Sequence, residues 1–407
     1  MTLAARAAAG LAVLACAGAL RAMPFPDAPS SAVPDPSALD RAFRQMLDAS
    51  AIVEAEDRNR VERALDAVVR RVDRSVAGTR SPRRRARRMH RALHDTLFLR
   101  YDARADGIDS PLDRGRYNCV SAVLLEGLVA SRLGFEARVV ESPTHLSLRL
   151  LAGGETVDVD SVSPEGFDTH RDLRAFERLL LAYKLATPGE IRRRGLDTLF
   201  DEFNEVTGTV DLASAVAYLW HNAGERAVEE GRGLEAARCF LEAHRTHPGL
   251  GARDDSLPSL LARAFRIEYD AGRFEAANRV AIVENAILPG RTGARDRLLA
   301  SAIQRIEAAA ERGETALAEI LLRDTDAVST FPEDRVKLER EACPQIVAAS
   351  LREGDWIRAR RMIAVYLGAG GDPEEAAALS AWADRRQAGP APPRAAPAPS
   401  ASRAPGR

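Results

Sequence analysis

The stretch Asn118–Gly166 reads NCVSAVLLEGLVASRLGFEARVVESPTHLSLRLLAGGETVDVDSVSPEG, and the rest of the chain is arranged around it. Cys119 opens a helical pattern, His145 begins a strand, and Asp160 ends the next strand. A cysteine, a histidine and an acid are the nucleophile, base and orienting group of a cysteine-based active site. The order of the three residues therefore makes them candidate catalytic residues.

The helix that begins this stretch places Cys119 where a thiol becomes reactive. Asn118 is a favourable N-cap because its side chain can accept from a first-turn amide, and Gly134 suits the position after the last turn. Apolar and small residues recur between them at helical spacing: Val120, Val123, Leu124, Gly127, Leu128 and Ser131. Cys119 falls in the first turn, where unpaired amides and the helix dipole favour a thiolate.

Three strand patterns follow, over 135–142, 145–151 and 155–160. The last two flank Gly153-Gly154, a signal for a two-residue hairpin turn. This turn predicts the cross-strand pairs Leu148–Val159, Leu150–Val157, Arg149–Asp158 and Ser147–Asp160. One face of the hairpin is then apolar and the other polar.

His145 and Asp160 fall on the polar face as diagonal neighbours. Backbones at such positions lie roughly 7–8 Å apart, so the side chains can meet. Asp158 is farther from His145 and has Arg149 opposite it. We therefore predict that Asp160 orients His145 and that Asp158 pairs with Arg149, although a slip of one residue would reverse the choice.

These residues resemble the transglutaminase-like superfamily of cysteine enzymes, which share a papain-like order of Cys, His and Asp. In the bacterial cores of this superfamily the Cys opens a helix, the His follows a short strand and the Asp ends the next strand. Cys119, His145 and Asp160 fill these positions. Leu146 and Val162 depart from the pattern, since the superfamily usually has an aromatic residue and a Thr there.

A closer likeness is to bacterial proteins that join such a core to helical repeats. These proteins share a Tyr-Asp segment, a Pro-x-His and a Gly after the acid, which correspond here to Tyr101-Asp102, Pro143-Thr144-His145 and Gly166. The resemblance covers roughly residues 80–170. It implies an α+β fold, with a transglutaminase-like core and N-terminal helices followed by an all-α tetratricopeptide-like solenoid.

The resemblance also implies acyl transfer at an amide, in which Cys119 forms a thioester, His145 moves the proton and Asp160 holds the His tautomer. The backbone N–H of Cys119 could donate to the oxyanion, with Asn118 or Tyr117 as second donors or as parts of the site wall. Hydrolysis of a protein or peptide is favoured over amine transfer, because crosslinking needs a site that excludes water. No cofactor is expected.

A second interpretation makes the protein a non-catalytic scaffold or adaptor of the cell envelope that uses its repeat groove. The state of Cys119 separates the two interpretations. An accessible thiol within reach of His145 favours the enzyme, whereas a thiol buried in apolar packing, with His145 turned away, favours the scaffold.

The whole chain has 407 residues, a hydrophobic content of 46% and a formal net charge of −1, which together predict two or three globular domains. The near-neutral charge gives no reason to expect a nucleic-acid partner.

The N-terminus, over residues 1–22, has the pattern of an export signal. Arg6 precedes the apolar segment Ala7–Ala15, and two processing sites compete. Ala17-Gly18-Ala19 suits signal peptidase, whereas Val13-Leu14-Ala15-Cys16 resembles a bacterial lipobox, in which Cys16 would carry a lipid that attaches the protein to a membrane. An uncleaved anchor is the third alternative. Each predicts an exported protein, either periplasmic or an anchored lipoprotein of a bacterial envelope.

Four cysteines are present: Cys16, Cys119, Cys239 and Cys343. Setting Cys16 aside leaves an odd number, and an unpaired Cys119 suits a nucleophile. Cys239 and Cys343 lie in helical patterns and are expected to be buried thiols. No cysteine spacing typical of a metal site is present.

A proline-rich tether over 23–36 leads into the segment 37–170, which combines helices with the core. One of its helices carries a row of arginines: Arg83, Arg84, Arg85, Arg87, Arg88 and Arg91. The row indicates either an anionic surface as partner or a solvated helix face. His90 and His94 have the spacing of a metal-binding pair, but no third ligand is apparent.

A helical bridge is predicted over 171–212, helical repeats over 213–385 and a disordered Pro/Ala-rich tail over 386–407. The first repeat resembles a tetratricopeptide unit in eight positions: Trp220, Ala223, Gly224, Ala227, Ala236, Phe240, Ala243 and Pro248. Small residues there would let two helices approach, with Phe240 between them. Stacked pairs would form a groove for a peptide or a protein partner, or else a rigid support for the core.

Overall fold

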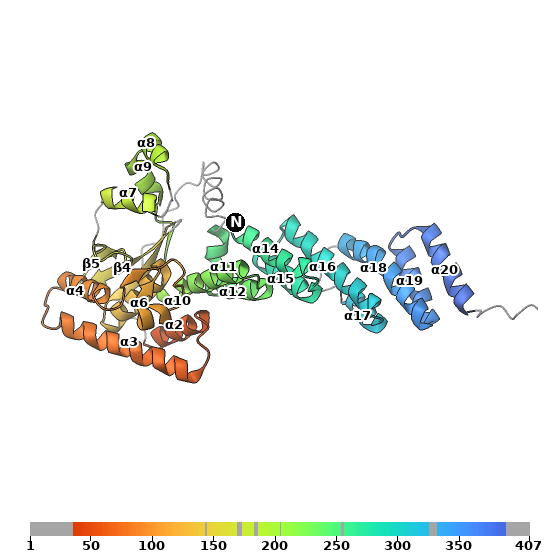
Figure 1. The fold of residues 1–407 in the computed structure, drawn as a ribbon, viewed down its shortest axis with the longest axis horizontal. Coiled ribbons are helices and arrows are strands. Elements are labelled where there is room, and N and C mark those ends of the chain that lie inside the picture. Colours follow the sequence, from red (N-terminus) through yellow and green to blue (C-terminus); the bar gives the residue numbers. More distant parts are fainter. Residues whose placement is uncertain are drawn as a thin grey trace, which may run out of the picture. The chain divides into compact units, whose positions relative to one another are not determined.

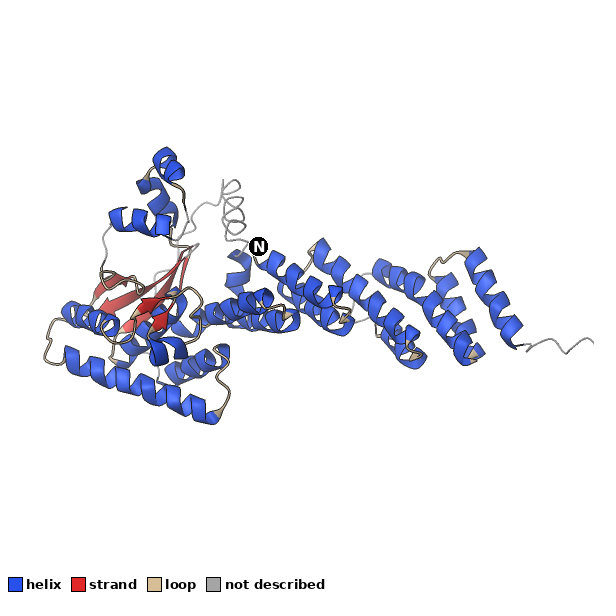
Figure 2. Ribbon diagram, in the orientation of Figure 1, coloured by secondary structure: helices blue, strands red, loops and turns tan. Residues whose placement is uncertain are grey.

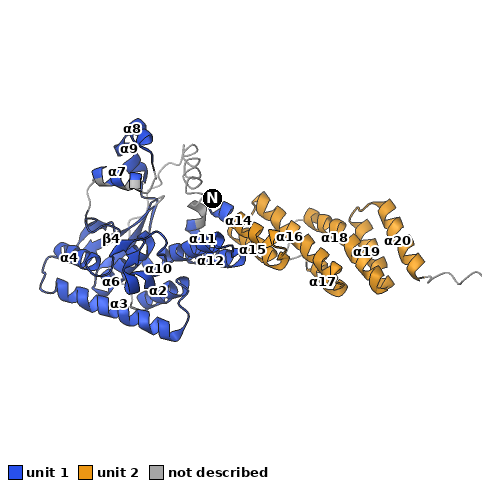
Figure 3. Ribbon diagram, viewed as in Figure 1, with its two compact units in different colours: residues 1–260 blue, residues 261–407 orange. Residues whose placement is uncertain are grey.

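The computed structural model describes residues 36–142, 145–168, 173–182, 186–203, 205–253, 256–324 and 332–387. The predicted signal, Cys16, nearly all of the tether and residues 388–407 of the predicted tail lie outside these ranges. The described chain is mostly helical with two small sheets (Figures 1 and 2). It divides into two compact units, residues 1–260 and 261–407 (Figure 3).

Unit 1 contains a four-stranded antiparallel sheet of order β5-β4-β3-β6. Its strands are β3 (Glu136–Ser142), β4 (His145–Ala152), β5 (Glu155–Val159) and β6 (Gly208–Val210). The predicted hairpin register is confirmed, since Leu148 faces Val159 and Leu150 faces Val157. Gly153 and Gly154 both have positive φ, 65° and 87°, which the tightest two-residue hairpin turn requires.

Helix α6 (Cys119–Arg132) packs on β3 and β4 and is buried over nearly its whole length. Three N-terminal helices contribute to the same hydrophobic core: α2 (Pro36–Ala49), α3 (Ala55–Val76) and α4 (Pro82–His94). Gly127 in α6 allows the close approach of α10 (Leu212–Ala215), because a Cβ there would lie 2.5 Å from Leu212 Cδ2. This packing fixes the start of α6, and with it Cys119, against the sheet.

The segment before Cys119 contains two short strands and a short helix. Strand β1 (Arg100–Tyr101) pairs in parallel with β2 (Arg116–Tyr117), and α5 (Asp109–Arg114) lies between them. The pairing of β1 with β2 sets the direction in which the chain enters α6.

The segment after Asp168 is helical, as predicted, through α7 (Leu173–Ala182), α8 (Pro188–Arg194) and α9 (Leu196–Phe203). These helices form their own small apolar cluster, which includes Phe176, Leu180 and Leu199. The helical bridge predicted over 171–212 is wrong near its end. Residues 208–210 form β6, because their backbone groups complete the exposed edge of β3.

The remaining helices follow as pairs with short turns: α11 (Ala217–Glu229) and α12 (Gly233–Thr246), then α13 (Pro248–Arg253), α14 (Leu257–Asp270) and α15 (Phe274–Ile287), α16 (Thr292–Glu311) and α17 (Thr315–Arg323), α18 (Pro332–Glu353) and α19 (Trp356–Gly368), and finally α20 (Pro373–Gln387). The turns inside the pairs each contain a glycine of positive φ, at intervals of 41 residues: Gly231, Gly272, Gly313 and Gly354. A recurrent turn of this kind marks an internal repeat of helix pairs.

The first pair packs in the way that its small residues predict. A Cβ on Gly224 would lie 2.6 Å from the ring of Phe240, which is 1% exposed. The absence of a side chain at Gly224 therefore lets the Phe240 ring fill the space between α11 and α12. Within the described residues, none of the helices combines the length and the apolar character that a membrane span needs.

Candidate active site

Cys119 is the first residue of α6, and its neighbours form a capping box. The backbone N–H of Ser121 donates to Asn118 Oδ1 at 2.9 Å, and the N–H of Asn118 donates to Ser121 Oγ at 3.0 Å. These bonds hold the first turn in place while the amides around Cys119 lie at the unpaired end of the helix. The thiol is free and partly accessible.

His145 begins β4, and its Nε2 lies 3.0 Å from Asp160 Oδ1. The side chains of His145 and Asp160 remain 27% and 32% exposed. Burial lowers the pKa of His145, but hydrogen bonds to Asp160 and to Cys119, together with their charges, outweigh it and raise the pKa to about 10. The imidazole is therefore protonated at neutral pH, next to the Cys119 sulfur.

Asp160 is held as a carboxylate. Burial raises its pKa, but the hydrogen bond and the positive charge of His145 reverse this and leave the pKa below its usual value. The backbone N–H of Val162 also donates to Oδ1, at 3.2 Å. Because Asp160 occupies Nε2 of His145, Nδ1 is the nitrogen left to exchange a proton with Cys119.

The structure thus brings together the three residues that the sequence singled out. Asp158 is placed as the hairpin register predicts, with two bonds from Arg149 to its carboxylate, at 2.7 and 2.9 Å. Asp160 is the acid that faces His145.

Asp160 lies in a tight turn that closes at Gly166. The N–H of Asp160 donates to the Gly166 carbonyl at 2.8 Å, and the N–H of Gly166 donates to the Ser163 carbonyl at 2.8 Å. A Cβ on Gly166 would overlap the carbonyl oxygen of Asp160. Only glycine fits this position, so the turn fixes the backbone that carries the acid.

Tyr117 and Asn118 occupy positions beside the nucleophile with defined partners. The Tyr117 hydroxyl donates to the Val162 carbonyl at 3.0 Å, so Tyr117 connects the entry to α6 with the Asp160 turn. Asn118 Oδ1 serves as the helix cap. Both residues are buried.

Sequence reasoning missed a buried pair behind the site. His90 of α4 is 1% exposed, and Glu126 of α6 is fully buried. His90 Nδ1 lies 2.9 Å from Glu126 Oε1, and Nε2 lies 2.9 Å from the carbonyl oxygen of Ser163 in the Asp160 turn. The signal available was one carboxylate, Glu126, inside an otherwise apolar helix.

The spacing of His90 and His94 does not reflect a metal site among the described residues, where no group of three or more His, Cys, Asp or Glu side chains could hold an ion. The two rings instead lie edge to face, 4.7 Å apart, and His94 also packs on Phe98. Burial, followed by the charge of His90, lowers the pKa of His94 to about 4.

Four arginines of the row on α4 have partners within the protein. Arg83 pairs with Asp168, Arg85 and Arg87 lie over the rings of Phe135 and Phe167, and Arg88 donates to Thr79. These contacts favour the interpretation of this face as part of the protein's own surface packing.

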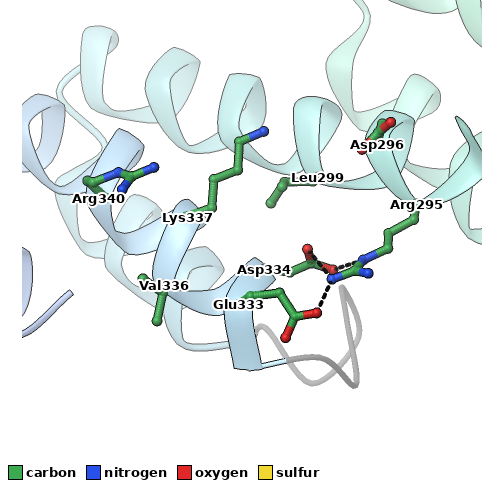
Figure 4. Close-up of a pocket in the computed structure, with 8 residues that line it drawn as sticks. All are labelled: Arg295, Asp296, Leu299, Glu333, Asp334, Val336, Lys337 and Arg340. Carbon is green, nitrogen blue, oxygen red and sulfur yellow. Dashed lines mark hydrogen bonds and ion pairs between the residues drawn. The ribbon is translucent and has the colours of Figure 1, made fainter. Parts of the chain in front are cut away.

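A pocket in unit 2 lies between α16 and α18 (Figure 4). Arg295 at one end is held by Glu333 at 2.9 Å and by Asp334 at 2.6 Å, and Lys337 and Arg340 line the other part. The residues that line this pocket include no Cys, Ser or His. The residues around Cys119 therefore remain the candidate active site.

Comparisons of the chain with protein-family models, with curated proteins and with solved structures give no match. The geometry of Cys119, His145 and Asp160 is what indicates a function for the chain.

Proposed function

We propose that the protein is an exported, transglutaminase-like cysteine enzyme that acts on amide bonds by acyl transfer, with hydrolysis as the outcome. One observation carries the proposal: His145 bonds Asp160 through Nε2 and interacts with the free thiol of Cys119 at the start of a helix. A nucleophile, a base and an orienting acid in contact are the elements that such chemistry needs.

In the proposed reaction the Cys119 sulfur attacks the amide carbonyl carbon and forms a C–S bond, and the carbonyl π electrons move to the oxygen. The imidazolium of His145 then gives its Nδ1 proton to the leaving nitrogen as the C–N bond breaks, which leaves a thioester. His145, now neutral, takes a proton from water as that water attacks the thioester. The thiolate leaves and the acid product departs.

Asp160 stays ionised throughout and accepts from Nε2–H, which keeps Nδ1 directed at the reacting atoms. The backbone N–H of Cys119 is the proposed oxyanion donor, because a first-turn amide has no acceptor inside its helix. The Tyr117 hydroxyl gives its one proton to the Val162 carbonyl, so it is not assigned as the second donor. Asn118 accepts from Ser121 through Oδ1, and its side-chain NH2 is the proposed second donor.

Hydrolysis is proposed over amine transfer because water can reach the site. The side chains of His145 and Asp160 are 27% and 32% exposed. Water therefore attacks a thioester formed there more readily than an amine does, unless a bound substrate excludes the solvent.

The other parts of the proposal rest on the sequence. Residues 1–22 support export, with lipidation at Cys16 as one form of it. The helix pairs, with their turn glycines 41 residues apart, support a tetratricopeptide-like repeat that binds the protein substrate or a protein partner.

The experiment that tests the proposal is acylation of Cys119 by p-nitrophenyl acetate, followed by intact-mass spectrometry. We expect one acetyl group on Cys119 in the wild type, its loss over time to water, and no acetylation in Cys119→Ser or His145→Ala. Methylamine added at high concentration tests transfer: faster loss, with formation of the N-methylamide, would indicate a transferase.

Cys239 and Cys343 are the internal controls. Burial raises the pKa of these thiols to about 11 and about 12, so neither should be acetylated in the folded protein. Equal acetylation of Cys119, Cys239 and Cys343, or no acetylation of Cys119, would contradict the enzyme proposal. The scaffold would then be the better explanation.

A further inference from the structure

His90 has a partner on each of its ring nitrogens, although it does not belong to the set of Cys119, His145 and Asp160. The Ser163 carbonyl can only accept, so Nε2 carries a proton, and Glu126 Oε1 is the partner of Nδ1. Burial lowers the pKa of His90, but the charge and hydrogen bond of Glu126 and the bond to Ser163 raise it overall. Both ring nitrogens of His90 have a partner, which fixes the orientation of the ring, while Glu126 Oε2 has no partner among the described residues.

The Ser163 carbonyl is a junction of the Asp160 turn. It accepts from Nε2 of His90 and from the N–H of Gly166, and the carbonyl of Gly166 in turn accepts from the N–H of Asp160. Three hydrogen bonds, through Ser163 and Gly166, therefore connect His90 to the backbone of the acid. Tyr117 also attaches the turn, because its hydroxyl donates to the Val162 carbonyl.

The pair also spans the elements that define the site. His90 belongs to α4, Glu126 lies two turns after Cys119 in α6, and Ser163 lies in the turn that follows β5. The helix that carries the nucleophile and the turn that carries the acid are thus held to each other through one imidazole ring. A change in this ring would move Asp160 relative to His145.

We propose that His90 and Glu126 are positioning residues that hold Asp160 against His145 by fixing the Ser163 carbonyl. This inference rests on the proposed function, because it assigns the pair to the same set of Cys119, His145 and Asp160. Neither residue touches the substrate; both act through the turn.

Two substitutions of His90 distinguish a positioning role from a general contribution to the stability of the fold. In His90→Gln the side-chain amide can occupy the place of Nε2 and still donate to the Ser163 carbonyl. In His90→Asn the amide can occupy the place of Nδ1, which keeps the contact with Glu126 but falls short of Ser163. Both variants lose the imidazole ring, so a merely structural role predicts similar effects of the two.

The readout is the pH dependence of Cys119 alkylation by iodoacetamide, measured on the full chain with thermal unfolding in parallel. We expect His90→Asn to slow alkylation at pH 6 by about tenfold or more, because a free thiol is largely protonated there. His90→Gln should keep most of the wild-type rate. His94→Phe, one turn further along α4, is the matched control and should keep the wild-type profile.

Three results are informative in different ways. A wild type whose alkylation at pH 6 is no faster than that of a free thiol would refute the proposed function itself. A reactive wild type with His90→Asn, His90→Gln and His94→Phe all unchanged would overturn the positioning role alone. Equal losses in His90→Asn and His90→Gln, in proportion to their loss of thermal stability, would also overturn it, since that is the pattern of a structural residue.

Discussion

At the scale of single residues, the choice between two acids decides the mechanism. Asp160 and Asp158 both lie near the polar face of the hairpin, but only Asp160 meets His145, while Asp158 forms a bidentate pair with Arg149. The register explains the difference, because residues two apart on one strand face different partners on the next. A matched pair of substitutions can therefore test the assignment.

Asp160→Asn should reduce acetylation of Cys119 by roughly 10²- to 10⁴-fold, because the amide cannot stabilise the imidazolium of His145. Asp158→Asn should stay within about twofold of the wild type, since it removes an exposed ion pair of little energetic weight. Rates from intact-mass time courses provide the measurement. Similar rates in the two variants would show that Asp160 is not the orienting acid.

The lowered pKa of His94 predicts that the folded protein loses stability in acid. Its pKa is about 4 in the folded protein, through burial and the charge of His90, against 6.5 for an unperturbed imidazole. The folded state disfavours the protonated ring. The stabilisation is therefore fully present above pH 6.5 and is lost as the pH falls from 6.5 through 4.

His94→Phe cannot take up a proton and can still pack on Phe98. Its free energy of unfolding should fall less than that of the wild type between pH 7.5 and pH 4.5, by on the order of 1–3 kcal/mol. Urea unfolding at the two pH values gives the comparison. An equal fall in both proteins would mean that His94 has no part in the acid sensitivity.

At the scale of elements, the sequence predicts best where local chemistry decides. The turn glycines set the hairpin register, and Asn118 marks the start of the Cys119 helix. Strand β6 was missed because its three residues carry no periodicity and form a strand only by pairing with β3. The contact of His90 with Ser163 was missed because it joins residues 73 positions apart, which no local pattern encodes.

Gly224 tests the packing of the first helix pair. An alanine would favour helix α11 on propensity by about 1 kcal/mol, but its Cβ would lie 2.6 Å from the Phe240 ring. Overpacking of this kind costs about 1–3 kcal/mol, so we expect Gly224→Ala to destabilise the protein. Calorimetry measures the shift of the unfolding transition.

Gly368→Ala is the control for this prediction. Gly368 ends α19, and a Cβ there would meet nothing within 4 Å. Its substitution should be neutral or slightly stabilising. If Gly224→Ala behaved in the same way, the close contact between α11 and α12 would not be a constraint on the fold.

At the scale of the whole molecule, the first helix pair belongs with the part that carries the candidate site. Arg226 of α11 pairs with Asp106 in the loop before Cys119 at 2.5 Å. Tyr218 and His247 both bond Glu141 of β3, at 2.7 and 3.0 Å. The first compact unit accordingly extends to residue 260, whereas the sequence pattern begins the repeats at 213.

This difference has a physical cause. The repeat pattern is set by packing inside each pair, such as Phe240 against Gly224, and it says nothing about ion pairs with distant loops. The three bonds to Glu141 and Asp106 attach the pair to the strand before His145 and to the loop before Cys119. The first pair thus supports both sides of the candidate site.

The most direct test of the central claim is the pH dependence of Cys119 alkylation by iodoacetamide, in wild type and in His145→Ala, with the modified cysteine identified by mass spectrometry. A working pair of Cys119 and His145 predicts half-maximal alkylation well below the pH of about 8.5 that a free thiol shows, and loss of this reactivity in the variant. Alkylation of Cys119 only after unfolding, or the same profile in both proteins, would contradict it.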